Sequence, residues 1–344
     1  MRHFDVDFRD KNGERYQLSK RIAELTEALM ANYFVYDTEV LEGVWFRDGK
    51  FTYEQREEGT WLPFDTEHDT WGYADCYAWM KHSFTVPTRF AGRPVYYQIL
   101  PQEGKKWAWG SPQALLYANG EALQGFDSNH TRTRLLDCAQ GGEHYEMLLN
   151  LYAGGRDYEG KIGTRLRLLS VDDEVEKLYW HLRTPLEVAN LKEPDELARI
   201  HLLQTLNEAV SLVSFHLPYG EDFLESVREA TAYLEKELYG KREMEATVSA
   251  VGHTHIDVAW LWRLRQTRDK TSRSFATVLK LMEEYPDYRF MSSQAQLYEF
   301  IRQEHPAIFA RIRESVRQGR WEPEGGMWVE ADTNLSSGES LVRQ

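Results

Sequence analysis

The last hundred residues alternate between short apolar runs and longer stretches with helical periodicity. The apolar runs are "EATVSAVG" (residues 245–252), "YRFMSS" (288–293) and "RWEPEGG" (320–326). Between them, apolar residues recur at spacings of three and four, which is the pattern of an amphipathic helix. A strand, helix, strand, helix, strand order requires right-handed crossovers, which produce a parallel sheet. Residues 245–344 therefore predict the first βαβαβ part of an α/β domain with parallel strands and a barrel-like architecture.

The residues before this segment show two other patterns. Apolar residues at spacings of four, three and four between Leu18 and Leu29 predict a leading helix. Short runs rich in β-branched and aromatic residues follow, divided by turn residues such as the Asn119-Gly120 pair, and they predict an all-β, sandwich-like unit with a tight hairpin. After residue 170, residues that favour helices dominate the sequence. The predicted organisation is a leading helix and β-sandwich domain over residues 1–170, a helical connector over 171–244 and the first part of an α/β domain over 245–344.

Composition narrows the range of partners. The 344 residues carry a formal charge of −14, so neither the basic face that phosphate binding requires nor a nucleic-acid partner is expected. No run approaches the roughly 20 apolar residues of a membrane span, and no apolar signal segment follows Met1. Cys76 and Cys138 are the only cysteines, which suits a reducing compartment. We expect a cytoplasmic protein without a membrane partner, and homo-oligomers remain compatible with the sequence.

A potential metal site follows the first predicted strand of the α/β segment, in "VGHTHIDVAWLW". Alternation along an extended backbone would place His253, His255 and Asp257 on one side and the intervening residues on the other. Imidazole nitrogens and carboxylate oxygens are ligands that suit zinc. The pattern by itself leaves open whether His253 is a ligand or a residue that supports one.

A second candidate segment, "EGGMWVEADTN", follows the third predicted strand. Its paired glycines, Gly325 and Gly326, permit close backbone approach. If the first and third strands were neighbours in the sheet, Asp332 would lie within reach of a metal held at Asp257. A carboxylate beside a metal stays ionised and can serve as ligand, nucleophile or both, although a lone Asp after a strand is also typical of a turn or helix cap.

The two segments together resemble glycoside hydrolase family 38, the α-mannosidases, and more narrowly the cytosolic and bacterial type. The stretch "LLYANGEALQGFDSNHT" in the β region is similar to that type's N-terminal accessory domain. The resemblance implies a zinc site formed by His255, Asp257 and Asp332, with His253 supporting the ligands. It also implies that Asp332 is the nucleophile, that Trp260 stacks on the substrate, and that the reaction is retaining hydrolysis of α-mannosides in mannose-containing oligosaccharides.

Members of that family are several hundred residues longer and carry a further zinc-ligating histidine and an acid/base carboxylate. We therefore expect this chain to be an N-terminal portion, to coordinate one Zn²⁺ incompletely and to have little or no activity alone. Two other functions fit the residues. One is an amidohydrolase-like zinc hydrolase in which both His253 and His255 are ligands. The other is a non-catalytic carbohydrate-binding or assembly fragment.

Overall fold

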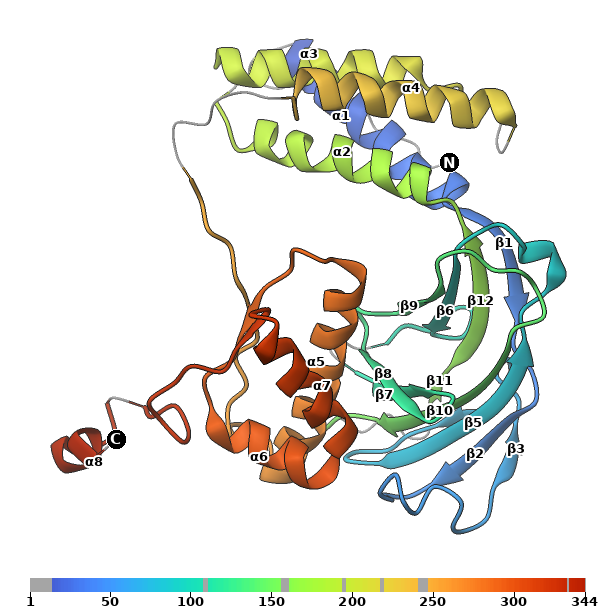
Figure 1. The fold of residues 1–344 in the computed structure, drawn as a ribbon. Helices are drawn as coiled ribbons and strands as arrows, with labels where there is room; N and C mark the ends of the chain where they lie inside the picture. Colours follow the sequence, from blue (N-terminus) through green and yellow to red (C-terminus); the bar gives the residue numbers. More distant parts are fainter. Residues whose placement is uncertain are drawn as a thin grey trace.

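The computed structural model of the chain describes residues 14–107, 111–155, 161–193, 196–216, 220–240, 247–332 and 334–343. The chain combines helices with several antiparallel sheets and one small parallel sheet (Figure 1). The α-helices are α1 Glu14–Ala28, α2 Asp173–Asn190, α3 Leu197–Leu212, α4 Glu221–Glu237, α5 Leu264–Glu284, α6 Ala295–Glu304, α7 Pro306–Arg317 and α8 Gly338–Arg343. The strands are β1 Val35–Val40, β2 Val44–Asp48, β3 Leu62–Phe64, β4 Thr70–Trp71, β5 Tyr77–Thr85, β6 Val95–Leu100, β7 Gln113–Ala118, β8 Glu121–Phe126, β9 Arg132–Leu136, β10 His144–Tyr152, β11 Ile162–Gly163, β12 Arg165–Val171, β13 Gly252–His253, β14 Phe290–Met291 and β15 Trp321–Glu322.

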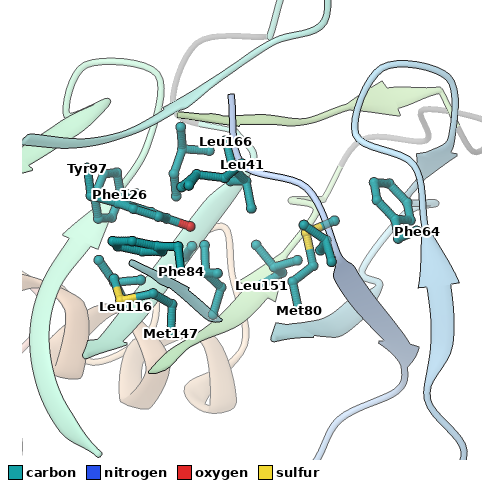
Figure 2. Packing of buried hydrophobic residues seen from close by; sticks show 14 of the residues in the cluster. Leu41, Phe64, Met80, Phe84, Tyr97, Leu116, Phe126, Met147, Leu151 and Leu166 are labelled. Carbon is teal, nitrogen blue, oxygen red and sulfur yellow. The ribbon is translucent and has the colours of Figure 1, made fainter. Parts of the chain in front are cut away.

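A β-sandwich lies below helices α1 to α4 and beside helices α5 to α7 (Figure 1). One sheet has the order β1-β12-β6-β9 and the other the order β3-β2-β5-β10-β7-β8, and all their neighbouring strands are antiparallel. Alternate residues of each strand face inward, so the two sheets share one core. Figure 2 shows Tyr97 and Leu166 from the first sheet packed with Met80, Leu116 and Met147 from the second. The predicted all-β, sandwich-like unit is confirmed, and the structure adds that its two sheets are antiparallel.

The hairpin between β7 and β8 has the predicted turn. Asn119 has φ 49° and Gly120 has φ 87°. Positive φ at both central residues defines the type I′ turn, whose twist matches that of the flanking strands, and Asn and Gly tolerate it best. This turn ends the pair of strands against which the α/β segment packs.

Helices α1 to α4 pack together above the four-stranded sheet (Figure 1). Ile22 and Leu29 lie fully buried among residues of α2, α3 and α4, and Tyr96 and Leu169 of the sheet join the same cluster. The leading helix, grouped with the β region on sequence, therefore packs against the helices of the connector. Asp172 begins α2, where its side chain accepts hydrogen bonds from two backbone N–H groups of the first turn.

The α/β segment contains the predicted three parallel strands in the order β13-β14-β15. Each of these strands has only two residues. The first is confined to Gly252–His253, whereas the apolar run predicted a strand over residues 245–252. Residues 245 and 246 of that run lie outside the described ranges. The described strands form an open sheet, so the barrel-like closure predicted from the sequence is not seen in them. Helices α5 to α7 cover this sheet and bury Phe290 and Trp321.

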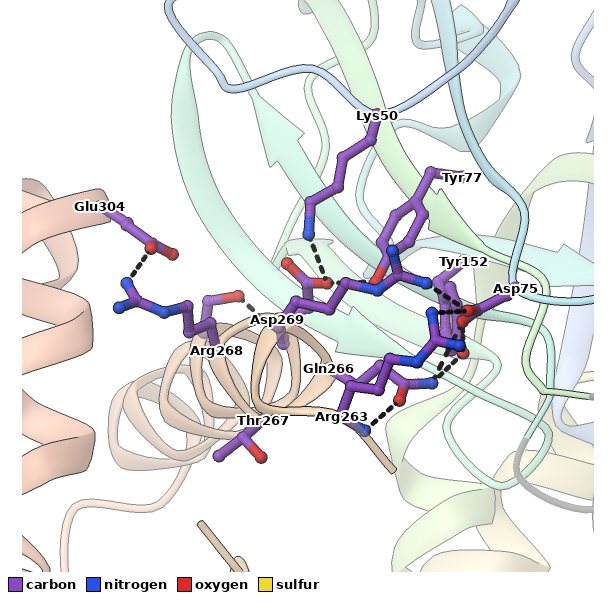
Figure 3. A network of polar contacts seen from close by, with 12 residues as sticks. Lys50, Asp75, Tyr77, Tyr152, Arg263, Gln266, Thr267, Arg268, Asp269 and Glu304 are labelled. Carbon is purple, nitrogen blue, oxygen red and sulfur yellow. Dashed lines mark hydrogen bonds and ion pairs between the residues drawn. The ribbon is translucent and has the colours of Figure 1, made fainter. Parts of the chain in front are cut away.

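The same helices dock onto the sandwich through β8. The backbone N–H of Gly125 donates to Thr277 Oγ1 (3.0 Å), and a Cβ at Gly125 would lie 2.9 Å from the carbonyl oxygen of Arg273, so only glycine permits this contact. A polar network adds to the apolar contact (Figure 3). In it, Tyr77 donates to Asp269 of α5 (2.7 Å). The β-sandwich therefore fixes the helix that follows the potential metal site. None of the described helices combines the length and the apolar composition needed to cross a bilayer.

Candidate metal and catalytic site

The potential metal residues lie where β13 ends. His253 is its last residue, and His255 and Asp257 occupy the loop that follows. Ile256 is completely buried, whereas the side chain of His255 is 53% exposed and that of Asp257 is 40% exposed. The burial therefore follows the alternation expected from the sequence, with the polar side chains open to solvent at the carboxyl end of the strand.

His255 lies between two carboxylates. Its Nε2 is 3.0 Å from Asp257 Oδ1, and its Nδ1 is 3.0 Å from Glu330 Oε2. The hydrogen bond with Asp257 is the largest cause of a raised His255 pKa. Burial opposes this increase, and the charge of Glu330 adds a smaller one. The arrangement favours the doubly protonated imidazolium when no metal is bound.

The pair of His255 and Asp257 fits two positions of a zinc site. Two ligands of a tetrahedral zinc ion lie about 3.3 Å apart, since each bond is about 2.0–2.1 Å long, and Nε2 and Oδ1 are 3.0 Å apart. Glu330 cannot complete the same site in this arrangement, because it contacts the opposite nitrogen of the ring. Across the described ranges, no set of three or more His, Cys, Asp or Glu side chains is arranged to hold a metal.

Asp332 lies elsewhere than expected from the sequence. β14 separates β13 from β15, so the first and third strands are not neighbours and the condition for bringing Asp332 close to Asp257 is not met. The N–H of Asn334 donates to Asp332 Oδ1 (2.9 Å), and the N–H groups of Leu335 and Ser336 donate to its carbonyl oxygen. In the part of the chain that the structure describes, no hydrogen bond or ion pair joins Asp332 to His255 or Asp257. Its exposed carboxylate sits in a turn.

Glu330, and not Asp332, is the carboxylate after β15 that lies next to His255. It follows β15 and reaches His255 across the end of β14, where Ser293 donates to its Oε1 (2.7 Å). Sequence reasoning did not choose it, although it lies two residues before Asp332 and after the end of a strand. Gly325 allows the crossing, because a Cβ there would lie 2.3 Å from the carbonyl oxygen of Ser293.

Gln294 joins the loops that follow β13 and β15. Its side chain is 4% exposed, its Nε2 donates to the carbonyl of Ile256 (2.8 Å), and its Oε1 accepts from the N–H of Glu330 (3.2 Å). From the sequence it was read only as a weak candidate for ligand contact or as a helix-start residue, not as a bridge between loops. The only signal was its position directly after the second strand, since a buried amide bridge between distant loops leaves no local pattern.

His253 and Trp260 flank the pair. His253 Nδ1 is 2.9 Å from the carbonyl of Met291, which makes Nδ1 the donor and leaves Nε2 as the acceptor. Trp260 is 67% exposed and follows Ala259, whose φ of 87° is rare for a residue with a side chain. Trp262 is held by a hydrogen bond from its Nε1 to Thr267 (2.9 Å). Trp260 is therefore the more exposed of the two tryptophans, and its ring meets that of Trp262 at an edge-to-face angle, with centroids 5.5 Å apart.

Comparisons with known proteins agree with this layout. Residues 245–344 match the model described as the glycosyl hydrolases family 38 N-terminal domain. Alpha-mannosidase G of Dictyostelium discoideum is 29% identical over 287 residues, which cover 77% of this chain and 25% of that protein. Alpha-mannosidase 2C1 of Homo sapiens is 30% identical over 296 residues, which cover 80% of this chain and 27% of that protein.

The chain thus spans about a quarter of the length of these curated relatives. Their alignments extend well beyond the hundred residues of the family match and so include part of the segment before residue 245. Among solved structures, a β-glucuronidase from an uncultured Clostridium sp. is similar at 12% identity over 40% of this chain and 29% of that one, with a TM-score of 0.27, which is too low to support an assignment. By the match of residues 245–344, together with these relatives, the chain is identified as an N-terminal portion of a glycosyl hydrolase of family 38.

Proposed function

We propose that this chain provides part of the active site of a zinc-dependent, retaining α-mannosidase that acts in the cytoplasm on mannose-containing oligosaccharides. The observation that carries the proposal is the exposed pair of His255 and Asp257 at the carboxyl end of β13, within the segment that matches the family. The relatives named as alpha-mannosidases support the substrate class. The full catalytic domain would then continue the open parallel sheet into the barrel-like architecture predicted from the sequence.

Zinc would be held by His255 Nε2 and Asp257 Oδ1, with Asp332 as the third ligand, and would bind hydroxyl groups of the sugar and orient its ring. Because Nε2 can coordinate zinc only without its proton, His255 would lose that proton and with it the hydrogen bond to Asp257 Oδ1. Glu330 would then accept the remaining proton's hydrogen bond from Nδ1 and fix the imidazole tautomer. Asp332 requires a movement of its turn to join this pair.

The proposed chemistry uses Asp332 as nucleophile. Its carboxylate attacks the anomeric carbon, the bond to the leaving oxygen breaks, and a separate acid protonates that oxygen. Water then attacks the same carbon, releases Asp332 and leaves the product with its original anomeric configuration. Trp260 would stack on the sugar through its exposed ring. Within the described ranges we assign no residue to the acid role.

The direct test is hydrolysis of 4-nitrophenyl α-D-mannoside, followed by proton NMR of the first product. The proposal predicts α-mannose as the first anomer released by a complete enzyme that contains this chain. The same enzyme carrying Asp332→Asn should hydrolyse the substrate at roughly a thousandth of the wild-type rate or less. The proposal also predicts little or no turnover by the 344-residue chain alone. Release of β-mannose, or full activity of the Asp332→Asn enzyme, would overturn the proposed mechanism.

A further inference from the structure

The six-stranded sheet carries a hollow that the proposed catalytic site does not use. Its volume is about 480 Å³, within the range of roughly 300–1,000 Å³ that is usual for small-molecule sites. Met80, Leu116 and Met147 point from this sheet into the sandwich core. The residues next to them in sequence, among them Lys81 and Tyr117, therefore face the opposite side, where the hollow lies.

The floor of the hollow is one straight row of side chains. Tyr117 lies opposite Leu148, Leu148 opposite Lys81, and Lys81 opposite Trp45, so that the row crosses β7, β10, β5 and β2. Three strand spacings give it a length of roughly 14 Å. Trp45 ends the row with 44% of its surface exposed. The sheet therefore holds an open aromatic ring at one end of an elongated floor.

One wall of the hollow is the turn that contains Tyr53 and Glu57. The ring of Tyr53 stacks on Tyr117 with centroids 4.6 Å apart, and its hydroxyl donates to the carbonyl of Gly120 (3.0 Å). Glu57 Oε2 lies 3.4 Å from Lys81 Nζ. The wall is thus tied to the floor at both ends, and a preformed site of this kind loses little ordering entropy when a ligand binds.

The charges of the lining indicate the kind of ligand. Arg56 and Lys81 are cationic, and Glu57 and Glu146 are anionic, so the lining offers donors and acceptors without a net charge. A phosphorylated or polyanionic ligand would meet both carboxylates. A pyranose sugar has an apolar C–H face that suits the Trp45 ring and hydroxyl groups that both donate and accept.

We propose that this hollow binds a neutral oligosaccharide, as a binding site of the β-sandwich separate from the site at β13. The proposal does not depend on the mannosidase assignment, because none of the lining residues belongs to residues 245–344. A catalytic chain with such a second site would keep a polymeric or branched substrate close to the reacting end.

The test is isothermal titration calorimetry of the 344-residue chain with mannobiose, cellobiose and lactose, each in buffer with EDTA. We expect saturable binding of at least one sugar to the wild-type chain. Trp45→Ala should lower the affinity about tenfold, because a lost ring contact of about 1.4 kcal/mol corresponds to that factor. Trp180→Ala is the matched control, because Trp180 lies on α2 and is similarly exposed, at 51%. Its affinity should equal that of the wild type.

Two further variants separate this site from the one at β13. His255→Ala should bind the sugar as the wild type does, and Glu146→Gln should weaken binding even if Trp45→Ala proves poorly folded by circular dichroism. Absence of saturable binding with all three sugars would overturn the proposal. So would equal affinity for the wild type and a folded Trp45→Ala chain, or loss of binding in His255→Ala.

Discussion

Nε2 of His255 lies 3.0 Å from Oδ1 of Asp257, and both side chains are open to solvent at the carboxyl end of β13. The two residues are neighbours on one side of an extended backbone, and buried Ile256 between them fixes that orientation. Metal binding at this pair must compete with a proton, because the same contact stabilises the protonated imidazole.

Glu330→Gln should lower the pKa of His255 from its raised value. The hydrogen bond with Asp257 is the larger cause of the increase and remains in the variant, so the pKa should fall only part of the way. NMR titration of the imidazole resonances measures it. Glu339→Gln, which removes an exposed carboxylate paired with Arg343 in α8, is the control and should leave the His255 titration unchanged. An unchanged His255 pKa in Glu330→Gln would contradict the contact.

Gln294→Ala should lower the free energy of unfolding by about 1–3 kcal/mol, because it leaves the carbonyl of Ile256 and the N–H of Glu330 without their partner. Gln296→Ala is the matched control. It removes a glutamine from the same region whose side chain accepts from the exposed Trp328 (2.9 Å), so its effect should be smaller. Urea denaturation measures both variants. Equal effects would show that Gln294 does not bridge the loops.

Much of this architecture could be predicted from the sequence, because it depends on local periodicity. The period of two in the β region, the Asn119-Gly120 turn and the strand and helix order after residue 245 are properties of neighbouring residues. The contact of Glu330 with His255 was missed because it depends on the path of a loop over β14. The packing of α1 against α2 and α3 likewise depends on residues far apart in sequence.

Asp75→Ala should weaken the contact between the sandwich and α5. The Asp75 carboxylate accepts from Tyr152 (2.9 Å) and Arg263 (3.3 Å), and also from Arg265 (Figure 3). Its loss leaves these donors without a charged partner, so we expect a decrease of about 1–3 kcal/mol in the free energy of unfolding. Asp137→Ala is the control, since that side chain is 90% exposed and should change stability by no more than about 0.5 kcal/mol. An effect of Asp75→Ala as small as that of the control would contradict the role of the network.

The pair of Asp127 and His130 should make stability depend on pH. Burial alone would raise the pKa of Asp127, but hydrogen bonds from the His130 side chain and from two backbone N–H groups lower it to about 2, and the same side-chain contact raises the pKa of His130. A raised His pKa adds stability that is present below the unfolded value and is lost as pH rises through the folded value. A lowered Asp pKa adds stability that is present above the unfolded value and is lost as pH falls towards about 2.

The stability difference between the wild type and Asp127→Asn should therefore be largest between the ordinary Asp pKa of about 3.9 and the ordinary His pKa of about 6.5. It should decline on either side of that window. Urea denaturation at a series of pH values measures this difference. His68→Ala is a control for a similar but exposed pair, formed with Asp65. A difference between the wild type and Asp127→Asn that does not vary with pH would contradict the assignment.

The most direct test of the metal site is zinc binding, measured by competition with a chelator at pH 7.5 for the wild type, His255→Ala, His253→Ala and His68→Ala. We predict one zinc ion per wild-type chain, loss of that ion in His255→Ala, a weaker effect in His253→Ala and none in His68→Ala, whose imidazole faces Asp65 at a similar 2.9 Å. Equal loss in His253→Ala and His255→Ala would favour two histidine ligands. Failure of the wild-type chain to bind zinc, or unchanged binding in His255→Ala, would contradict the account.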